Sequence, residues 1–83
     1  MIDIELVRQF VIENYLYGDG GRLKDDTSFL EHGIIDSTGV VELVTFIQDT
    51  FHIMVADDEM LPENLDSLKN IEGYLKRKSG VME

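Results

Sequence analysis

The sequence predicts an all-α fold of four helices in one domain over residues 1–83. Apolar side chains recur every three or four positions in several stretches, which is the spacing of an amphipathic helix. No stretch shows the regular apolar–polar alternation that is typical of a half-buried strand. A chain of 83 residues forms one small core, which leaves little room for a deep, walled active site.

The first helix is expected over residues 3–16, with Asp3 available to cap its start. Its apolar face carries Ile4, Val7, Phe10 and Val11, and its polar face carries Glu5, Arg8, Gln9 and Glu13. The stretch YGDGGRLKDDTSFLEHGIID, residues 17–36, follows. With four glycines and about 20 residues, it exceeds the usual connection, which suggests a function of its own. Four apolar residues are expected to pin this loop to the core: Phe29, Leu30, Ile34 and Ile35.

The second helix is expected over residues 37–51. Val40, Val44, Ile47 and Phe51 repeat at helical spacing, with Val41 and Leu43 beside them, whereas Glu42, Thr45 and Asp49 point outward. A minor third helix is expected over residues 57–65, which hold the single proline of the chain. The last helix is expected to start at Ser67. Leu68, Ile71 and Leu75 form its buried stripe, and Lys76, Arg77 and Lys78 suit the negative end of its dipole.

The charge of the chain is strongly negative and unevenly distributed. Seventeen Asp and Glu against seven Lys and Arg give a net charge of −10, which argues against binding to a nucleic-acid backbone. No Lys or Arg occurs from Asp25 to Leu68, although eleven acidic residues fall in this window. Such an uninterrupted excess of negative charge either keeps a small protein in solution or attracts basic protein partners.

The composition also limits the compartment and the chemistry. The chain has no cysteine, so any thiol chemistry must come from a cofactor. Its first residues, MIDIELVRQF, lack the basic start and the unbroken apolar run of a signal peptide, and no stretch has membrane-spanning length. We therefore expect a cytoplasmic protein with neither a membrane nor a nucleic acid as partner.

Catalytic and metal-binding patterns are weak. His32 and His52 have no recognisable partner arrangement around a nucleophile, so an enzyme is not expected. The carboxylates from Asp19 onward lack the alternating ligands, central glycine and final glutamate of an EF-hand, and GDGG lacks the spacing and ending of a P-loop. No metal site is expected.

Ser37 is the candidate functional residue, and it allows two interpretations. An Asp-Ser pair at a helix start can simply accept hydrogen bonds from free N–H groups. As a whole, however, the stretch GIIDSTGVVELV, residues 33–44, resembles the attachment motif of acyl and peptidyl carrier proteins. The residues that carry this resemblance are Gly33, Ile34, Ile35, Asp36, Ser37, Val41, Glu42, Leu43 and Val44. Phe51, Val55, Asp57 and Glu59 continue the family pattern.

The resemblance implies a four-helix bundle of the acyl-carrier type, with a long first loop and a short third helix. Ser37 would accept 4′-phosphopantetheine from coenzyme A through a phosphopantetheinyl transferase, which Asp36 would help to engage. The thiol of the arm would hold an acyl or aminoacyl group as a thioester. The implied protein is a monomeric carrier. An acyl- or amino-acid-activating ligase would load it, and downstream biosynthetic enzymes would unload it.

Partners of such a carrier would contact Thr38, Gly39, Glu42 and Asp49. The chain departs from the family where a large aliphatic residue usually follows the serine, because it has Thr38 and then Gly39. Residues 48–50, often all acidic in fatty-acid carriers, are Gln, Asp and Thr. These departures favour a free-standing carrier of a dedicated pathway, loaded with an amino acid or another small acid. The alternative is an unmodified acidic helical adaptor that binds a basic protein, in which Ser37 only caps the helix.

Overall fold

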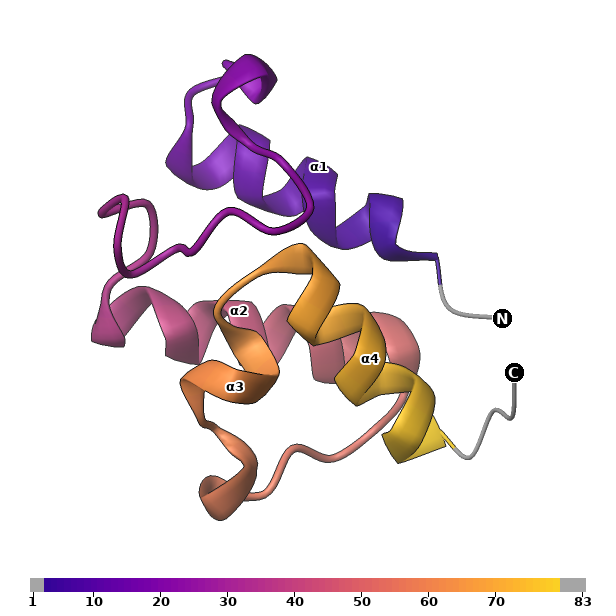
Figure 1. The fold of residues 1–83 in the computed structure, drawn as a ribbon. Coiled ribbons are helices and arrows are strands. Elements are labelled where there is room, and N and C mark those ends of the chain that lie inside the picture. The colour runs from indigo at the N-terminus through magenta and orange to yellow at the C-terminus, as the bar shows by residue number, and fades with distance from the viewer. Residues whose placement is uncertain (1–2, 80–83) are drawn as a thin grey trace.

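The computed structural model describes residues 3–79, and Figure 1 shows their arrangement. The elements follow in the order α1 (Ile4–Tyr15), η1 (Gly20–Arg22), α2 (Ser37–Phe51), η2 (Asp57–Glu59), α3 (Pro62–Leu65) and α4 (Leu68–Ser79). Residues 3–79 contain no strand, so the predicted all-α class with four helices is confirmed. Among the helices of residues 3–79, none combines the length and the apolar character that a membrane span requires.

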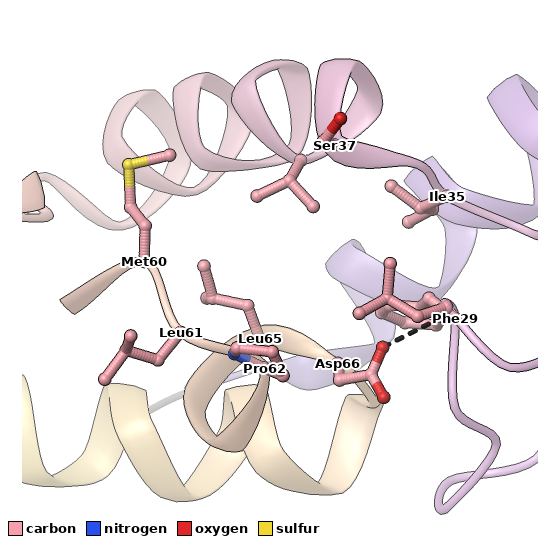
Figure 2. Close-up of a pocket in the computed structure, with 10 residues that line it drawn as sticks. Phe29, Ile35, Ser37, Met60, Leu61, Pro62, Leu65 and Asp66 are labelled. Carbon is pink, nitrogen blue, oxygen red and sulfur yellow. Dashed lines mark hydrogen bonds between the residues drawn. The ribbon is translucent and has the colours of Figure 1, made fainter. Parts of the chain in front are cut away.

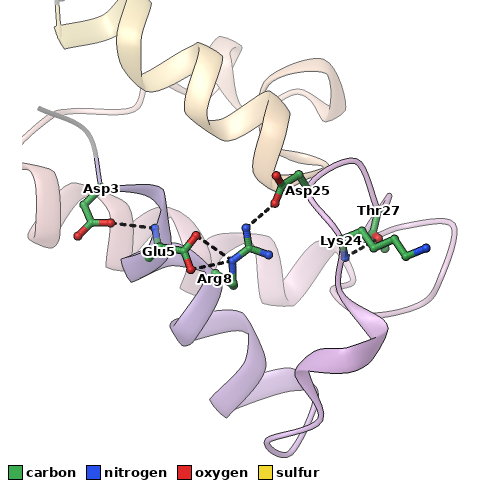
Figure 3. A network of polar contacts seen from close by, with 6 residues as sticks. All are labelled: Asp3, Glu5, Arg8, Lys24, Asp25 and Thr27. Atoms are coloured by element: carbon green, nitrogen blue, oxygen red, sulfur yellow. Dashed lines mark hydrogen bonds and ion pairs between the residues drawn. The ribbon is translucent and has the colours of Figure 1, made fainter.

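Helix α1 begins and ends within one residue of the predicted bounds. The carboxylate of Asp3 accepts a hydrogen bond of 3.1 Å from the Glu5 N–H, as Figure 3 shows, so the predicted cap is confirmed. Val7 and Val11 are fully buried, and Ile4 and Phe10 pack partly buried beside them. The 3.6-residue spacing therefore identified the core-facing side of this helix correctly.

Helix α2 has the predicted bounds, but its buried face is rotated from the predicted one. Gly39, Leu43, Val44 and Ile47 are buried, whereas Val40 and Phe51 are only partly buried. Val41, which was expected beside the core, is 56% exposed. The helix ends where His52 adopts a left-handed conformation with φ of 57° and its N–H bonds to the Gln48 carbonyl.

One hydrophobic core joins the helices and the long loop. The largest side chains in it are at most 2% exposed: Phe29, Ile35, Leu43, Ile47, Leu68, Ile71 and Leu75. Burying each such side chain stabilises the fold by about 1.5–3 kcal/mol relative to leaving it exposed. Two of the seven, Phe29 and Ile35, belong to the loop, so this loop is part of the core.

Asp66, at the end of α3, holds the loop in place. Its backbone carbonyl accepts a hydrogen bond of 2.8 Å from the Phe29 N–H. Its carboxylate accepts one of 2.9 Å from the Leu30 N–H and another from the Ser28 hydroxyl. Phe29, Ile34 and Ile35 are buried as predicted, but the expectation for Leu30 is wrong, since it is 50% exposed. The backbone of Leu30 is bonded to the Asp66 carboxylate, and its side chain lies at the rim of a cavity.

A second attachment of the loop lies beside the start of α1 (Figure 3). The Arg8 guanidinium bonds to both carboxylate oxygens of Glu5 and to the carboxylate of Asp25. The Asp25 carbonyl in turn accepts a hydrogen bond of 2.8 Å from the Lys69 N–H at the start of α4. The loop is thus fixed to α1 and α4 near Asp25 and to α3 near Phe29.

The predicted minor third helix is present as α3, but its predicted bounds, residues 57–65, are wrong because this segment forms two short pieces. A 3-10 turn, η2, precedes α3, and Met60 and Leu61 separate them. Pro62 is the first residue of α3, a position where its missing N–H costs no helical hydrogen bond. The Glu59 carboxylate accepts a bond of 2.9 Å from the Ala56 N–H, which closes the η2 turn separately.

Helix α4 begins one residue later than predicted. Ser67 caps it, since the Ser67 hydroxyl accepts a hydrogen bond of 3.1 Å from the Asn70 N–H. The stripe of Leu68, Ile71 and Leu75 is buried as predicted, and Tyr74 joins it. The Tyr74 hydroxyl donates a bond of 3.1 Å to Glu59, and the Lys78 ammonium bonds to the same carboxylate at 2.7 Å, so α4 also anchors η2. The Lys78 bond contributes most to holding the pKa of Glu59 below its usual value.

Candidate functional site

At the start of α2, Asp36 and Ser37 occupy different positions relative to the helix. Asp36 has an extended backbone, and its Oδ1 accepts a hydrogen bond of 2.8 Å from the Gly39 N–H. Asp36 is therefore the N-cap, and Ser37 is the first residue of the helix. The interpretation of Ser37 as the helix cap is wrong.

Ser37 is exposed, and in Figure 2 its hydroxyl points away from the apolar side chains below it. Within residues 3–79 the hydroxyl forms no hydrogen bond. Its position on the first turn of a long helix combines a fixed backbone with access from solution. The N–H groups of a first helical turn also favour a phosphate group attached beside them.

A cavity of about 260 Å³ opens beside Ser37 (Figure 2). Its walls come from the loop, from α2 and from the segment that runs from η2 through α3. The residues that line it are Phe29, Leu30, Ile35, Ser37, Val40, Met60, Leu61, Pro62, Leu65 and Asp66. Most are apolar, and the cavity can shelter an apolar group of modest size. The sequence did not indicate this cavity, because the exposure of Leu30 and Leu61 is visible only in the folded chain.

The structure places Thr38 and Gly39 in different environments. Thr38 is exposed next to Ser37, whereas Gly39 is buried. A Cβ atom at Gly39 would lie 2.9 Å from Ile35 Cγ2 and 3.2 Å from Tyr15 Cε1. Gly39 therefore faces the chain's own side chains and presents no exposed side to a partner, contrary to the expectation from the sequence.

Glu42 is exposed and has a fixed hydrogen-bond partner in Tyr15. The Tyr15 hydroxyl donates a bond of 2.7 Å to Glu42 Oε1 and also approaches the Gly39 carbonyl oxygen at 3.2 Å. Burial, followed by this bond to a carboxylate, raises the pKa of Tyr15 to about 12. Tyr15 is a site residue that the sequence did not single out, because the spacing of α1 alone does not show what its last residue contacts.

Asp49 is exposed on α2, two turns after Glu42. His32 and His52 are exposed as well. Within residues 3–79, no three His, Asp or Glu side chains lie close enough together to hold a metal ion.

An exposed serine on the first turn of α2, capped by the preceding aspartate and placed beside a small apolar cavity, defines a carrier-type site in a small helical bundle. Comparisons with known proteins agree. The family model described as "Phosphopantetheine attachment site" matches residues 7–75. The chain therefore belongs to the phosphopantetheine attachment-site family.

Two similar proteins support this assignment. An acyl carrier protein of Helicobacter hepaticus is 32% identical over 76 residues, which cover 92% of this chain and 96% of the relative. The solution NMR structure of a holo acyl carrier protein from Nitrosomonas europaea superimposes with a TM-score of 0.77 at 23% identity. That match covers 96% of this chain and 99% of the other, and it shows the shared fold.

The chain is thus a non-catalytic acyl carrier that uses phosphopantetheine and presents its cargo to partner enzymes. The residues at the start of α2 fit this group, because they combine an accessible primary hydroxyl, helix N–H groups and a neighbouring apolar cavity. When bound, the group supplies the thiol that the sequence itself lacks. The alternative of an unmodified adaptor is not favoured.

Proposed function

We propose that Ser37 is the residue to which 4′-phosphopantetheine is attached. The observation that carries this proposal is the exposed hydroxyl on the first turn of α2, which is not engaged in capping because Asp36 performs that role. A phosphopantetheinyl transferase forms the bond between Ser37 Oγ and the pantetheine-bearing phosphorus of coenzyme A. The P–O bond of the diphosphate that joins this phosphorus to the adenosine side breaks, the hydroxyl proton passes to a base of the transferase, and 3′,5′-adenosine bisphosphate leaves.

Asp36 has two roles in this proposal. Its Oδ1 caps the helix through the Gly39 N–H, which fixes the backbone under Ser37. The second carboxylate oxygen is left to meet the transferase and the metal that the transferase carries. A carboxylate offers several acceptor positions, so both roles are compatible.

We further propose a dedicated pathway in which an acyl- or amino-acid-activating ligase loads the carrier with a small acid and downstream biosynthetic enzymes take the cargo. The cavity of about 260 Å³ supports a small cargo, because it lies below the usual range of pockets for drug-sized ligands, about 300–1,000 Å³. Thr38 beside Ser37, and Glu42 and Asp49 along α2, form the surface that these enzymes read. The proposed compartment is the cytoplasm.

The intact mass of the protein tests the attachment site. After incubation with coenzyme A and a broad-specificity phosphopantetheinyl transferase, the wild type should gain one phosphopantetheine and Ser37→Ala should gain none. Thr38→Ala is the matched control, since it removes the neighbouring exposed hydroxyl and should leave the mass gain intact. A mass gain in Ser37→Ala would place the attachment elsewhere and overturn the proposal.

A further inference from the structure

The cavity beside Ser37 has one charged side chain in its walls, that of Asp66. Apart from Ser37 and Asp66, every residue that lines this cavity is apolar. Figure 2 shows Asp66 across the cavity from Ser37, at the end of α3. The cavity is therefore an apolar space with a single carboxylate on one wall.

The described hydrogen-bond partners of the Asp66 carboxylate are neutral groups. One oxygen accepts a bond of 2.9 Å from the Leu30 N–H, and the other accepts a bond from the Ser28 hydroxyl. These donors orient the carboxylate without neutralising it. A carboxylate has about four acceptor positions, so Asp66 can accept a bond from a further donor inside the cavity.

The cavity is formed by the part of the sequence that has no cation. The residues that line it all lie between positions 29 and 66, and residues 25–68 contain no Lys or Arg. A carboxylate that faces an apolar space without a counter-ion costs free energy, and a positive group placed beside it offsets this cost. The cavity thus suits an apolar group that carries a positive charge, and it disfavours a group that carries a negative one.

We propose that this cavity selects cargo with a free ammonium group, so that the acid loaded on the carrier is a small apolar amino acid. The inference rests on the proposed attachment at Ser37, which lies beside the cavity. In an aminoacyl group, the ammonium and the side chain are bonded to the same carbon and enter the cavity together. The ammonium donates a hydrogen bond to the Asp66 carboxylate, and the apolar side chain packs against Val40 and Leu65.

A tethered cargo needs only a weak affinity for the cavity. Attachment through a flexible arm makes docking an intramolecular step, with an effective concentration in the millimolar range. The contact between ammonium and carboxylate should raise the docked population about fivefold, which corresponds to about 1 kcal/mol in a partly exposed site. A cargo with a second carboxylate would meet Asp66 as a like charge and should dock less than a neutral one.

The test compares three cargoes of nearly the same shape on the same carrier. A phosphopantetheinyl transferase attaches arms that carry alanyl, isobutyryl or methylmalonyl groups through an amide, which resists hydrolysis. The carbon next to the carbonyl bears a methyl group in all three, and beside it an ammonium, a second methyl or a carboxylate. NMR cross-relaxation between the cargo methyl and the Leu65 methyl groups measures the docked population. Alanyl should dock about fivefold more than isobutyryl, and methylmalonyl less than isobutyryl.

Three variants separate the charge of Asp66 from its structural role. Asp66→Asn removes the charge with little change in shape, and the preference for alanyl over isobutyryl should disappear. Ser28→Ala removes one hydrogen bond of the same carboxylate but keeps the charge, so the preference should remain. Glu63→Gln removes an exposed carboxylate of α3 outside the cavity, and the preference should also remain. Because the two cargoes are compared within each variant, a change of the fold that affects both cancels.

Equal docking of alanyl and isobutyryl in the wild type would overturn the inference. Loss of the preference in Ser28→Ala or Glu63→Gln as complete as in Asp66→Asn would also overturn it, because a loosened loop or the overall charge would then explain the preference. The mass of each loaded carrier is measured first. A wild type that gains no arm overturns the proposed attachment and this inference with it, whereas a wild type that gains the arm and docks both cargoes equally overturns this inference alone.

Discussion

The Tyr15 hydroxyl donates a hydrogen bond of 2.7 Å to Glu42 Oε1, and this contact joins the last residue of α1 to the second turn of α2. The same hydroxyl approaches the Gly39 carbonyl oxygen. One phenol thus holds a carboxylate of the proposed partner surface in a defined position, close to Ser37.

Removing this hydroxyl should loosen the junction between α1 and α2. Tyr15→Phe keeps the ring against Gly39 but loses the bond to Glu42, and we expect a loss of about 1 kcal/mol in the free energy of unfolding because Glu42 is exposed. Urea unfolding measures this change. Tyr17→Phe is the matched control, since Tyr17 is 94% exposed, and the midpoint should not move. Equal effects of the two variants would argue against the contact.

Stability should fall in strongly alkaline solution. Burial, with hydrogen bonds to Glu42 and Glu59 as the next cause, raises the pKa values of Tyr15 and Tyr74 to about 12 in the folded protein. An unfolded tyrosine titrates near pH 10. The folded protein therefore keeps the phenol protons of both tyrosines up to a higher pH than the unfolded chain does. The contribution of these raised pKa values to the free energy of unfolding is complete below a pH of about 10 and is lost as the pH rises to about 12.

Unfolding midpoints in urea and the phenolate absorbance between these pH values test this linkage. Glu42→Gln should lower the pKa of Tyr15, since an uncharged acceptor opposes the phenolate less, and Glu59→Gln should do the same for Tyr74. A midpoint that stays constant from pH 9 to pH 12 would contradict the assignment.

Gly39→Ala should destabilise the protein. Alanine favours a helix interior by about 0.5–1 kcal/mol over glycine, but overpacking typically costs about 1–3 kcal/mol. The new Cβ would lie 2.9 Å from the buried Ile35 side chain, so we expect a net loss of about 1 kcal/mol. Gly73→Ala on α4 is the control. Its Cβ would meet only the flexible Arg77 side chain at 3.5 Å, and it should be neutral or stabilising in thermal unfolding. Stabilisation by both substitutions would show that the space at Gly39 adapts.

Asp66→Ala should loosen the attachment of the loop to α3. The substitution removes the carboxylate that accepts hydrogen bonds from the Ser28 hydroxyl and the Leu30 N–H, but it keeps the backbone bond from Phe29. We expect a loss of about 1–3 kcal/mol in stability and faster amide hydrogen exchange at Leu30 and at Glu31, whose N–H bonds to the Ser28 hydroxyl. Asp58→Ala, a change at an exposed carboxylate of η2, should leave the exchange at both amides unchanged.

Thr38→Leu should slow the loading of cargo and leave the attachment of phosphopantetheine unchanged. Thr38 is exposed beside Ser37, so an added apolar side chain changes the shape that a loading enzyme meets but leaves the hydroxyl accessible. Phosphopantetheine attachment, measured by mass, should proceed as in the wild type, whereas loading by the native ligase should slow. Loading at the wild-type rate would remove Thr38 from the determinants of partner choice.

The sequence predicted the bounds of α1 and α2 well because each has a regular apolar repeat and a polar residue at its start. Asp3 and Asp36 both cap helices, and both helices begin where these residues indicate. The segment after α2 was harder to predict. Its composition is consistent with one short helix, but in the structure Pro62 begins a separate helical turn after η2.

Contacts between distant segments could not be predicted from the spacing of apolar residues along the chain. The burial of Gly39 depends on Tyr15, which is 24 residues earlier, and the position of Leu30 depends on Asp66, which is 36 residues later. Both relationships arise only when the helices pack. The motif around Ser37 identified it as the proposed attachment residue. Only the structure showed that Asp36, and not Ser37, caps α2.

The division between Asp36 and Ser37 has a consequence for the step that attaches the arm. If the hydroxyl that is modified also capped α2, attachment would remove a cap that contributes about 1 kcal/mol, and the first turn would fray. With the cap on Asp36, joining a group to Ser37 Oγ leaves the bond from the Gly39 N–H to Asp36 Oδ1 untouched. Under the proposed function, the chain offers its enzymes the same helix start before and after the arm is attached, and exchange of cargo at the thiol of the arm does not disturb it.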